Sequence, residues 1–139
     1  MTRTGPARSA DVSFAAGRLE SARAFREAAR AAAALAKDGA NANPIVSQIV
    51  NAAIAYTDVL TATFAGKVNQ QDHAGARKTL RAALGSRLPA AQERRLARIL
   101  GQKDEAQYGA GRISLTRARQ LLEELEELAA WAEAELRRQ

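Results

Sequence analysis

The chain has 139 residues, of which 47% are hydrophobic but only 4% aromatic, and it carries a formal net charge of +6 at pH 7. This length suits a single domain, and an apolar fraction dominated by Ala and Leu favours helices over strands. The absence of cysteine excludes disulfides, thiolate zinc sites and cysteine nucleophiles, and without a signal peptide or an uncharged membrane-spanning run we expect a cytoplasmic protein.

The first predicted helix covers residues 11–37 and follows a flexible N-terminus of residues 1–10. Apolar residues recur at every third or fourth position, and Asp11 can accept the first free N–H groups as a cap. The run Lys37-Asp38-Gly39 predicts the end of this helix, because Gly readily adopts the left-handed conformation found there.

The second predicted helix covers residues 44–65. Asn43-Pro44 is typical of a helix start, with Asn as the cap and Pro in the first position. The segment has apolar or small residues nearly all round, which indicates the helix that the others surround.

Three further helices are predicted at residues 72–84, 89–108 and 114–137, with Asp72 and Ser114 as caps for the first and the last. The last segment has the clearest amphipathic pattern in the chain. Short connections make neighbouring helices antiparallel, so we expect one all-α domain over residues 11–139. Its predicted form is an up-and-down bundle of four long or medium helices plus a short one.

Positive charge is concentrated in residues 73–103, which contain eight Lys or Arg residues against one acid, Glu93. This segment therefore holds +7, while the rest of the chain sums to −1. A concentrated positive field favours polyanionic partners, although the same residues also suit an ordinary solvated face. The residues predicted to bind nucleic acid or another anion are Arg77, Lys78, Arg81, Arg94, Arg95, Arg98 and Lys103.

Four other polar residues are candidates for a pocket: Tyr56 and Asp58 in the second helix, with Tyr108 and Arg112 from later segments. The alternative is that Tyr56 and Asp58 bond to each other inside the bundle and that Tyr108 lies in the core or at its rim. The acidic run at residues 123–127 lacks the His partners of a di-iron bundle, so we expect a solvated face, no metal and no cofactor.

Three segments of the chain together carry a family resemblance: the Ala-rich stretch from Asn51 to Leu60, the Gln71-Asp-His-Ala turn with Arg77-Lys-Thr-Leu after it, and Lys103-Asp-Glu-Ala-Gln-Tyr before the last helix. They resemble the HEPN domains, small helical bundles often found beside minimal nucleotidyltransferases. The resemblance covers nearly the whole chain. It implies a homodimer, RNA or a nucleotide as ligand, and a nucleotidyltransferase-type protein as partner, in a toxin–antitoxin, stress or defence system.

HEPN ribonucleases typically place an Arg, four to six intervening residues and a His in a cleft between two copies of the domain. The resemblance thus implies metal-independent chemistry, with His as general acid or base and Arg stabilising the phosphorane. This chain departs from that pattern, because no Arg stands at such a spacing before His73, its only histidine. Lys67 does stand there, but Lys lacks the planar two-pronged phosphate contact of Arg.

The leading hypothesis is therefore a non-catalytic HEPN-like bundle that binds RNA, a nucleotide or a partner protein through its basic segment. One rival is a metal-independent endoribonuclease that uses His73, with Lys67 or a basic residue of the dimer mate. The other rival is a pure protein-interaction bundle whose basic face docks an acidic protein.

Overall fold

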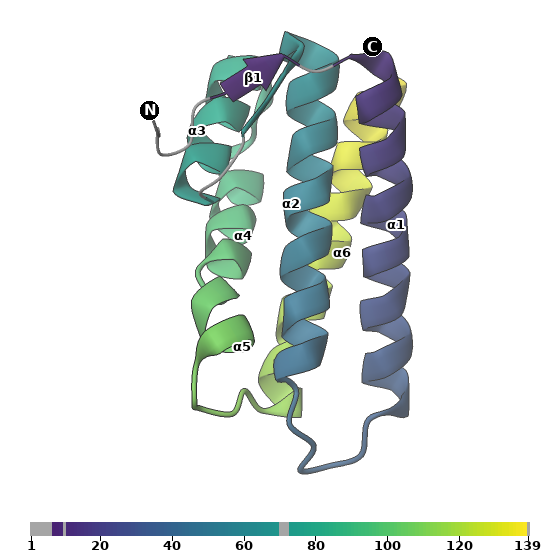
Figure 1. The fold of residues 1–139 in the computed structure, drawn as a ribbon, viewed down its shortest axis with the longest axis vertical. Coiled ribbons are helices and arrows are strands. Elements are labelled where there is room, and N and C mark those ends of the chain that lie inside the picture. Colours follow the sequence, from purple (N-terminus) through teal and green to yellow (C-terminus); the bar gives the residue numbers. More distant parts are fainter. Residues whose placement is uncertain (1–6, 10, 70–72, 139) are drawn as a thin grey trace.

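The structure, a computed structural model, describes residues 7–9, 11–69 and 73–138. Three long helices, α1 (Val12–Leu35), α2 (Asn43–Ala65) and α6 (Leu115–Arg137), pack together in the bundle (Figure 1). A segmented column of α3 (His73–Leu84), α4 (Ala90–Leu100) and α5 (Lys103–Tyr108) completes it. Successive members run in opposite directions, which confirms the predicted all-α up-and-down bundle.

Helix α2 contacts each of the other five α-helices and is the centre of the core, as its apolar sequence predicted. Its side chains at Val46, Ile49 and Val50 are fully buried. Although α2 is long and apolar enough to cross a membrane, most of it is enclosed by the other helices. Burial inside a bundle accounts for this composition equally well.

Two predicted helix caps are confirmed. The Asp11 carboxylate accepts a hydrogen bond from the Phe14 N–H at 2.8 Å, and the Ser114 hydroxyl oxygen accepts one from the Arg117 N–H at 3.1 Å. The predicted cap Asp72 lies outside the described residues. Gly66 ends α2 in the left-handed conformation, with φ of 64°.

The loop between α1 and α2 differs from the prediction. Helix α1 ends at Leu35 rather than Lys37, and Gly39 adopts its positive φ of 84° within the following turn. Asn43 is the first residue of α2 and not its cap, because its side chain bonds elsewhere. Its Oδ1 accepts from the Ile113 N–H at 2.7 Å and its Nδ2 donates to the Gly111 carbonyl at 2.9 Å, so it ties this loop to the start of α6.

The prediction of one helix over residues 89–108 is wrong, since the chain breaks between α4 and α5. At the break, the Gln102 N–H bonds to the Ile99 carbonyl three residues back, which tightens the last turn. Gly101 lies at this point, and Gly is a poor helix residue by about 1 kcal/mol relative to Ala. A short 3-10 turn, η1 (Gly85–Arg87), separates α3 from α4.

A small sheet was not predicted. Strands β1 (Ala7–Ser9) and β2 (Lys67–Asn69) pair antiparallel, with Arg8 opposite Val68. Residues 7–9 therefore belong to the folded unit, although the N-terminal segment was predicted to precede it. The pairing joins the segment before α1 to the segment after α2 (Figure 1).

Candidate anion-binding face

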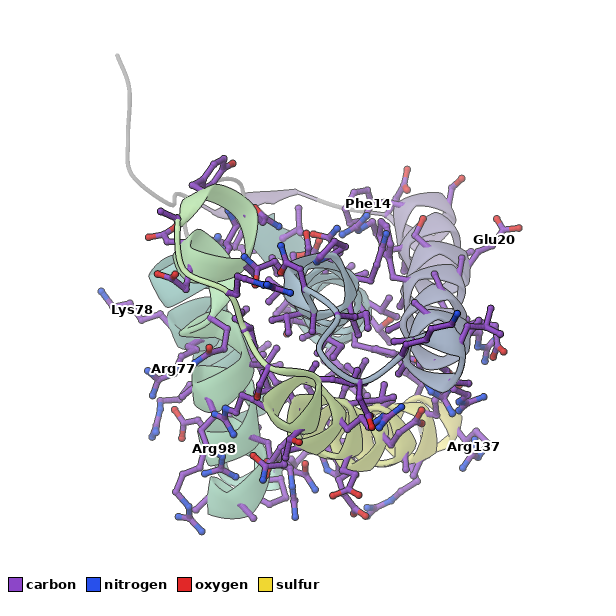
Figure 2. The ribbon with its side chains drawn as sticks, turned by 90° about the horizontal axis from the view of Figure 1, so that it is seen from below. Phe14, Glu20, Arg77, Lys78, Arg98 and Arg137 are labelled. Carbon is purple, nitrogen blue, oxygen red and sulfur yellow. The ribbon has the colours of Figure 1, made fainter. Side chains whose placement is uncertain are left out.

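Helices α3 and α4 carry six of the seven cations that were predicted to bind an anion. We call these six the basic face: Arg77, Lys78, Arg81, Arg94, Arg95 and Arg98. Arg77, Lys78 and Arg98 project outward on the same side of the molecule (Figure 2). The fold thus brings together residues that are separated by up to 21 positions in the chain.

Glu93 of α4 lies between the two helices and bonds to α3. Both of its carboxylate oxygens accept hydrogen bonds from Arg81, including one from Nε at 3.1 Å, and Arg77 Nη2 lies 3.9 Å from Oε2. The hydrogen bond from Arg81 lowers the pKa of Glu93, and the same bond raises the pKa of Arg81. The carboxylate therefore stays ionised and fixes the Arg81 guanidinium.

Glu124 of α6 neutralises part of the other side of the face. Arg98 Nη2 donates to Glu124 Oε1 at 2.7 Å, and Arg95 Nε lies 3.6 Å from the same oxygen. These pairs join α4 to α6 where both helices are partly exposed. Surface pairs of this kind contribute at most about 1 kcal/mol each, and salt screens them.

Lys78 and Arg94 are exposed and make no ion pair or hydrogen bond among the described residues. The basic face therefore holds six cations against the two carboxylates of Glu93 and Glu124, an excess of four positive charges. The predicted concentration of charge survives folding, although ion pairs reduce it. Arg77, Lys78, Arg81 and Glu93 line a hollow of about 270 Å³ between α3 and α4.

The seventh predicted cation, Lys103, lies at the start of α5. Its Nζ donates to Gln107 Oε1 at 3.3 Å and lies 5.6 Å from the centroid of the Tyr108 ring. Tyr108 is 77% exposed, so it is not a core residue. An exposed aromatic beside a cation, on the same column as the basic face, suits stacking with an unpaired base.

The predicted pocket of Tyr56, Asp58, Tyr108 and Arg112 does not form. Tyr56 and Asp58 are buried and bond to arginines of α1, while Tyr108 is exposed on α5. Tyr56 and Asp58 do not bond to each other either. Asp58 Oδ2 accepts from Arg18 Nε at 3.1 Å, which places its charge between α1 and α2.

Arg112 lies at the opposite end of the bundle from Asp58. It donates to the Gly39 carbonyl at 2.7 Å, and Arg119 donates to the Ala33 carbonyl at 3.0 Å. Both residues line a polar hollow of about 540 Å³ beside the start of α6. Their positive charges lie near the C-terminal end of α1, where the helix dipole favours cations.

Sequence reasoning missed a set of ion pairs between α1 and α6. Arg23 donates to both oxygens of Glu133 at 2.9 and 2.6 Å, and Arg26 donates to Glu126 at 2.8 Å. Arg30 also bonds to Glu126, and Arg98 bonds to Glu124, so two of the four acids in the run 123–127 pair with arginines of other helices. The partners are about a hundred positions apart in the chain, and no local pattern signals such pairs.

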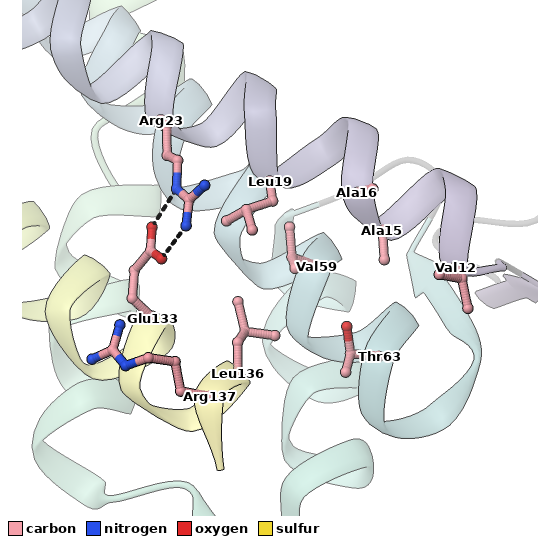
Figure 3. Close-up of a pocket in the computed structure, with 10 residues that line it drawn as sticks. All are labelled: Val12, Ala15, Ala16, Leu19, Arg23, Val59, Thr63, Glu133, Leu136 and Arg137. Atoms are coloured by element: carbon pink, nitrogen blue, oxygen red, sulfur yellow. Dashed lines mark hydrogen bonds and ion pairs between the residues drawn. The ribbon is translucent and has the colours of Figure 1, made fainter. Parts of the chain in front are cut away.

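A groove of about 360 Å³ runs beside this ion-pair set (Figure 3). Leu19 of α1, Val59 of α2 and Leu136 of α6 give it mainly apolar walls. The Arg23–Glu133 pair lies at one end of the groove, and Val12 lies at the other end (Figure 3). The groove gathers none of the residues that were predicted to form a site.

The two candidate catalytic residues are only partly described. Lys67 is exposed on β2 and, with Lys78, lines a hollow of about 490 Å³. His73 begins α3, but its side chain lies outside the described part of the structure. Among the side chains that are described, no cluster of three or more His, Asp or Glu residues could hold a metal ion.

Comparison with known proteins adds no relative. No protein-family model matches the chain, and no curated protein sequence matches it. The resemblance to HEPN domains therefore stays a hypothesis, and the inference of function depends on the geometry described above.

Proposed function

We propose that this protein is a non-catalytic helical bundle that binds single-stranded RNA through the basic face. The observation that carries the proposal is the excess of four positive charges on the basic face once Glu93 and Glu124 are counted, with Lys78 and Arg94 unpaired among the described residues. Phosphates neutralised by such side chains release counterions, which drives binding. The remaining surface needs no such explanation, since the chain outside the basic segment is close to neutral.

Single-stranded RNA fits the column better than a small nucleotide does. The cations extend over two helices instead of surrounding one deep pocket, and exposed Tyr108 lies further along the same column. A backbone can follow the cations while an unpaired base stacks on the Tyr108 ring. An acidic protein would pair with the same cations, but such pairing does not require an exposed aromatic ring beside Lys103.

The resemblance to HEPN domains supplies the proposed context, which is a cytoplasmic homodimer in a toxin–antitoxin, stress or defence system. A nucleotidyltransferase-type protein is the partner that this resemblance implies. Ribonuclease activity through His73 is the less favoured alternative, because its partner cation would be Lys67 and not Arg.

Charge reversal tests the proposal. We expect Lys78→Glu with Arg94→Glu to weaken the binding of a fluorescent single-stranded RNA at least tenfold and to flatten its salt dependence. In a plot of the logarithm of affinity against the logarithm of salt concentration, the slope should become shallower by about 0.7 for each phosphate contact removed. Fluorescence anisotropy across a series of salt concentrations measures both effects.

The matched control is Lys37→Glu with Arg137→Glu, which removes the same charge from exposed positions away from α3 and α4. Arg18 and Arg26 would not serve as control positions, because both are ion-paired beside the core. Equal losses in the two double variants would contradict the proposal and favour nonspecific attraction. RNA that is cut by the wild type and left intact by His73→Ala would instead establish the ribonuclease.

A further inference from the structure

The hollow between α3 and α4 has an arrangement of charge that the proposed function does not explain. Its walls are Arg77, Lys78, Arg81 and Glu93, and its volume is about 270 Å³. Glu93 has a side chain only 14% exposed, whereas the Arg77 and Arg81 side chains are 45% and 66% exposed. The carboxylate therefore lies below a rim of cations, and Lys78 projects outward from the same rim (Figure 2).

The cations of this rim are only partly neutralised. Arg81 makes hydrogen bonds to both oxygens of Glu93, but Arg77 stands 3.9 Å away, beyond hydrogen-bond distance. Lys78 has no partner among the described residues. Three cations and one carboxylate leave two positive charges around one small hollow.

A phosphodiester is a poor ligand for such a hollow. It carries one negative charge, so it gains little when it competes with the carboxylate that already holds Arg81. A terminal phosphate monoester carries a charge of about −1.5 to −2 at pH 7 and presents three strong acceptor oxygens. It matches the two uncompensated charges and can bond to Arg77 and Lys78 while Glu93 keeps the Arg81 guanidinium in place.

We propose that this hollow binds the terminal phosphate monoester of an RNA strand and that Glu93 excludes internal phosphodiesters from it. The inference rests on the proposed function, because the rest of the strand would lie along the basic face. It assigns separate tasks to two parts of that face. Arg94 and Arg98 hold the chain of phosphates, and the hollow recognises the end of the strand.

The experiment compares two fluorescent oligonucleotides of the same total charge. One carries a 5′-phosphate, and the other has a 5′-hydroxyl and is longer by two nucleotides at its 3′ end. We expect the phosphorylated strand to bind about tenfold more tightly, the effect of roughly one charge-assisted hydrogen bond. A 3′-phosphorylated strand, tested in parallel, shows which end of the RNA the hollow accepts.

Three variants test whether the hollow is the source of this preference. Arg77→Gln should remove the preference for the phosphorylated strand, while Arg94→Gln should weaken both strands equally. Glu93→Gln should strengthen binding of the 5′-hydroxyl strand, and it should therefore reduce the difference in affinity between the two strands. Thermal unfolding followed by circular dichroism checks that each variant is folded.

The outcomes separate this inference from the proposed function. If no phosphorylated strand binds better than the 5′-hydroxyl strand, the terminal-phosphate site is overturned, while salt-dependent binding that needs Arg94 would leave the RNA-binding face standing. If none of the strands binds, both ideas fail. A preference that persists unchanged in Arg77→Gln would also overturn the hollow as its source.

Discussion

Tyr56 connects three helices through its hydroxyl group. The hydroxyl accepts a hydrogen bond from Arg26 Nη1 at 3.3 Å and donates to Glu133 Oε2 at 3.1 Å. Burial raises the pKa of Tyr56, so the group keeps the proton that it donates. The only tyrosine of the core therefore has a structural task, which explains why a polar side chain is tolerated at the centre of apolar α2.

Glu133 should make the stability of the fold depend on pH. The hydrogen bond from Arg23 lowers the pKa of Glu133 below its ordinary value of 4.5. A depressed pKa in the folded state contributes stability above about pH 4.5, and this contribution is lost as the pH falls through the folded value. We expect Glu133→Gln to cost about 1 kcal/mol at neutral pH, since Arg23 is half exposed, and progressively less as the pH falls through the lowered pKa of Glu133.

Urea unfolding at several pH values measures this effect. The control is Glu123→Gln, an exposed residue of the same helix that has no ion pair among the described residues. Wild-type stability should still fall somewhat in acid because the pKa of Glu93 is lowered as well. A constant difference between wild type and Glu133→Gln from pH 7 to pH 3 would contradict the assignment.

At the scale of elements, α2 is the helix on which the fold depends. Ile49→Asp places an unpaired charge at a fully buried position and should cost several kcal/mol, enough to unfold a domain of this size. Far-ultraviolet circular dichroism and a thermal melt measure the loss. Ala28→Asp, at an exposed position of α1, should melt within a few degrees of the wild type.

The helices could be predicted where one local signal dominates. Asp11 and Ser114 cap their helices as expected, and Gly66 and Gly85 adopt positive φ where the chain turns. The break at Gly101 was missed because Leu96, Ile99 and Leu100 continue an amphipathic pattern right up to it. The β1–β2 pairing depends on two segments about sixty residues apart, which local propensity does not report.

The sequence predicted which residues form the candidate site, but it did not predict which ion pairs these residues make. Clustered cations in adjacent helices indicated the basic face, yet which of them meet Glu93 or Glu124 depends on how α3, α4 and α6 rotate against one another. The predicted pocket does not form for the same reason, because it also depended on how the helices rotate against one another. Tyr56 and Asp58 turned toward α1, whose arginines gave no sign of their role in the sequence.

At the scale of the whole molecule, the leucine stripe of α6 gives no argument for a dimer. Leu121, Leu125 and Leu128 are buried within the chain, and Trp131 is half-buried against the core. Among the described residues, the large apolar side chains that are exposed, Val12, Leu35 and Tyr108, lie on separate parts of the fold. Scattered exposed residues of this kind are normal for monomers, so the proposed homodimer now depends on the family resemblance.

Because each chain is positively charged, the proposed homodimer and the proposed RNA binding should respond in opposite ways to salt. Each chain carries +6, and the excess of four charges on the basic face would repel the same face of a second copy. We therefore expect association through another surface, with the basic faces left free. Because screening extends over about 30 Å at 0.01 M salt but only about 10 Å at 0.1 M, added salt should strengthen the dimer while it weakens RNA binding.

Sedimentation velocity at tens of micromolar protein, at low and moderate salt, measures this opposite response. Lys78→Glu with Arg94→Glu should leave the dimer intact, or stabilise it slightly at low salt, because it lowers the charge of each copy without touching the contact surface. A single species of 14.9 kDa at every salt concentration would contradict the homodimer. Dissociation caused by this double variant would place the contact on the basic face, where RNA and a second copy would compete.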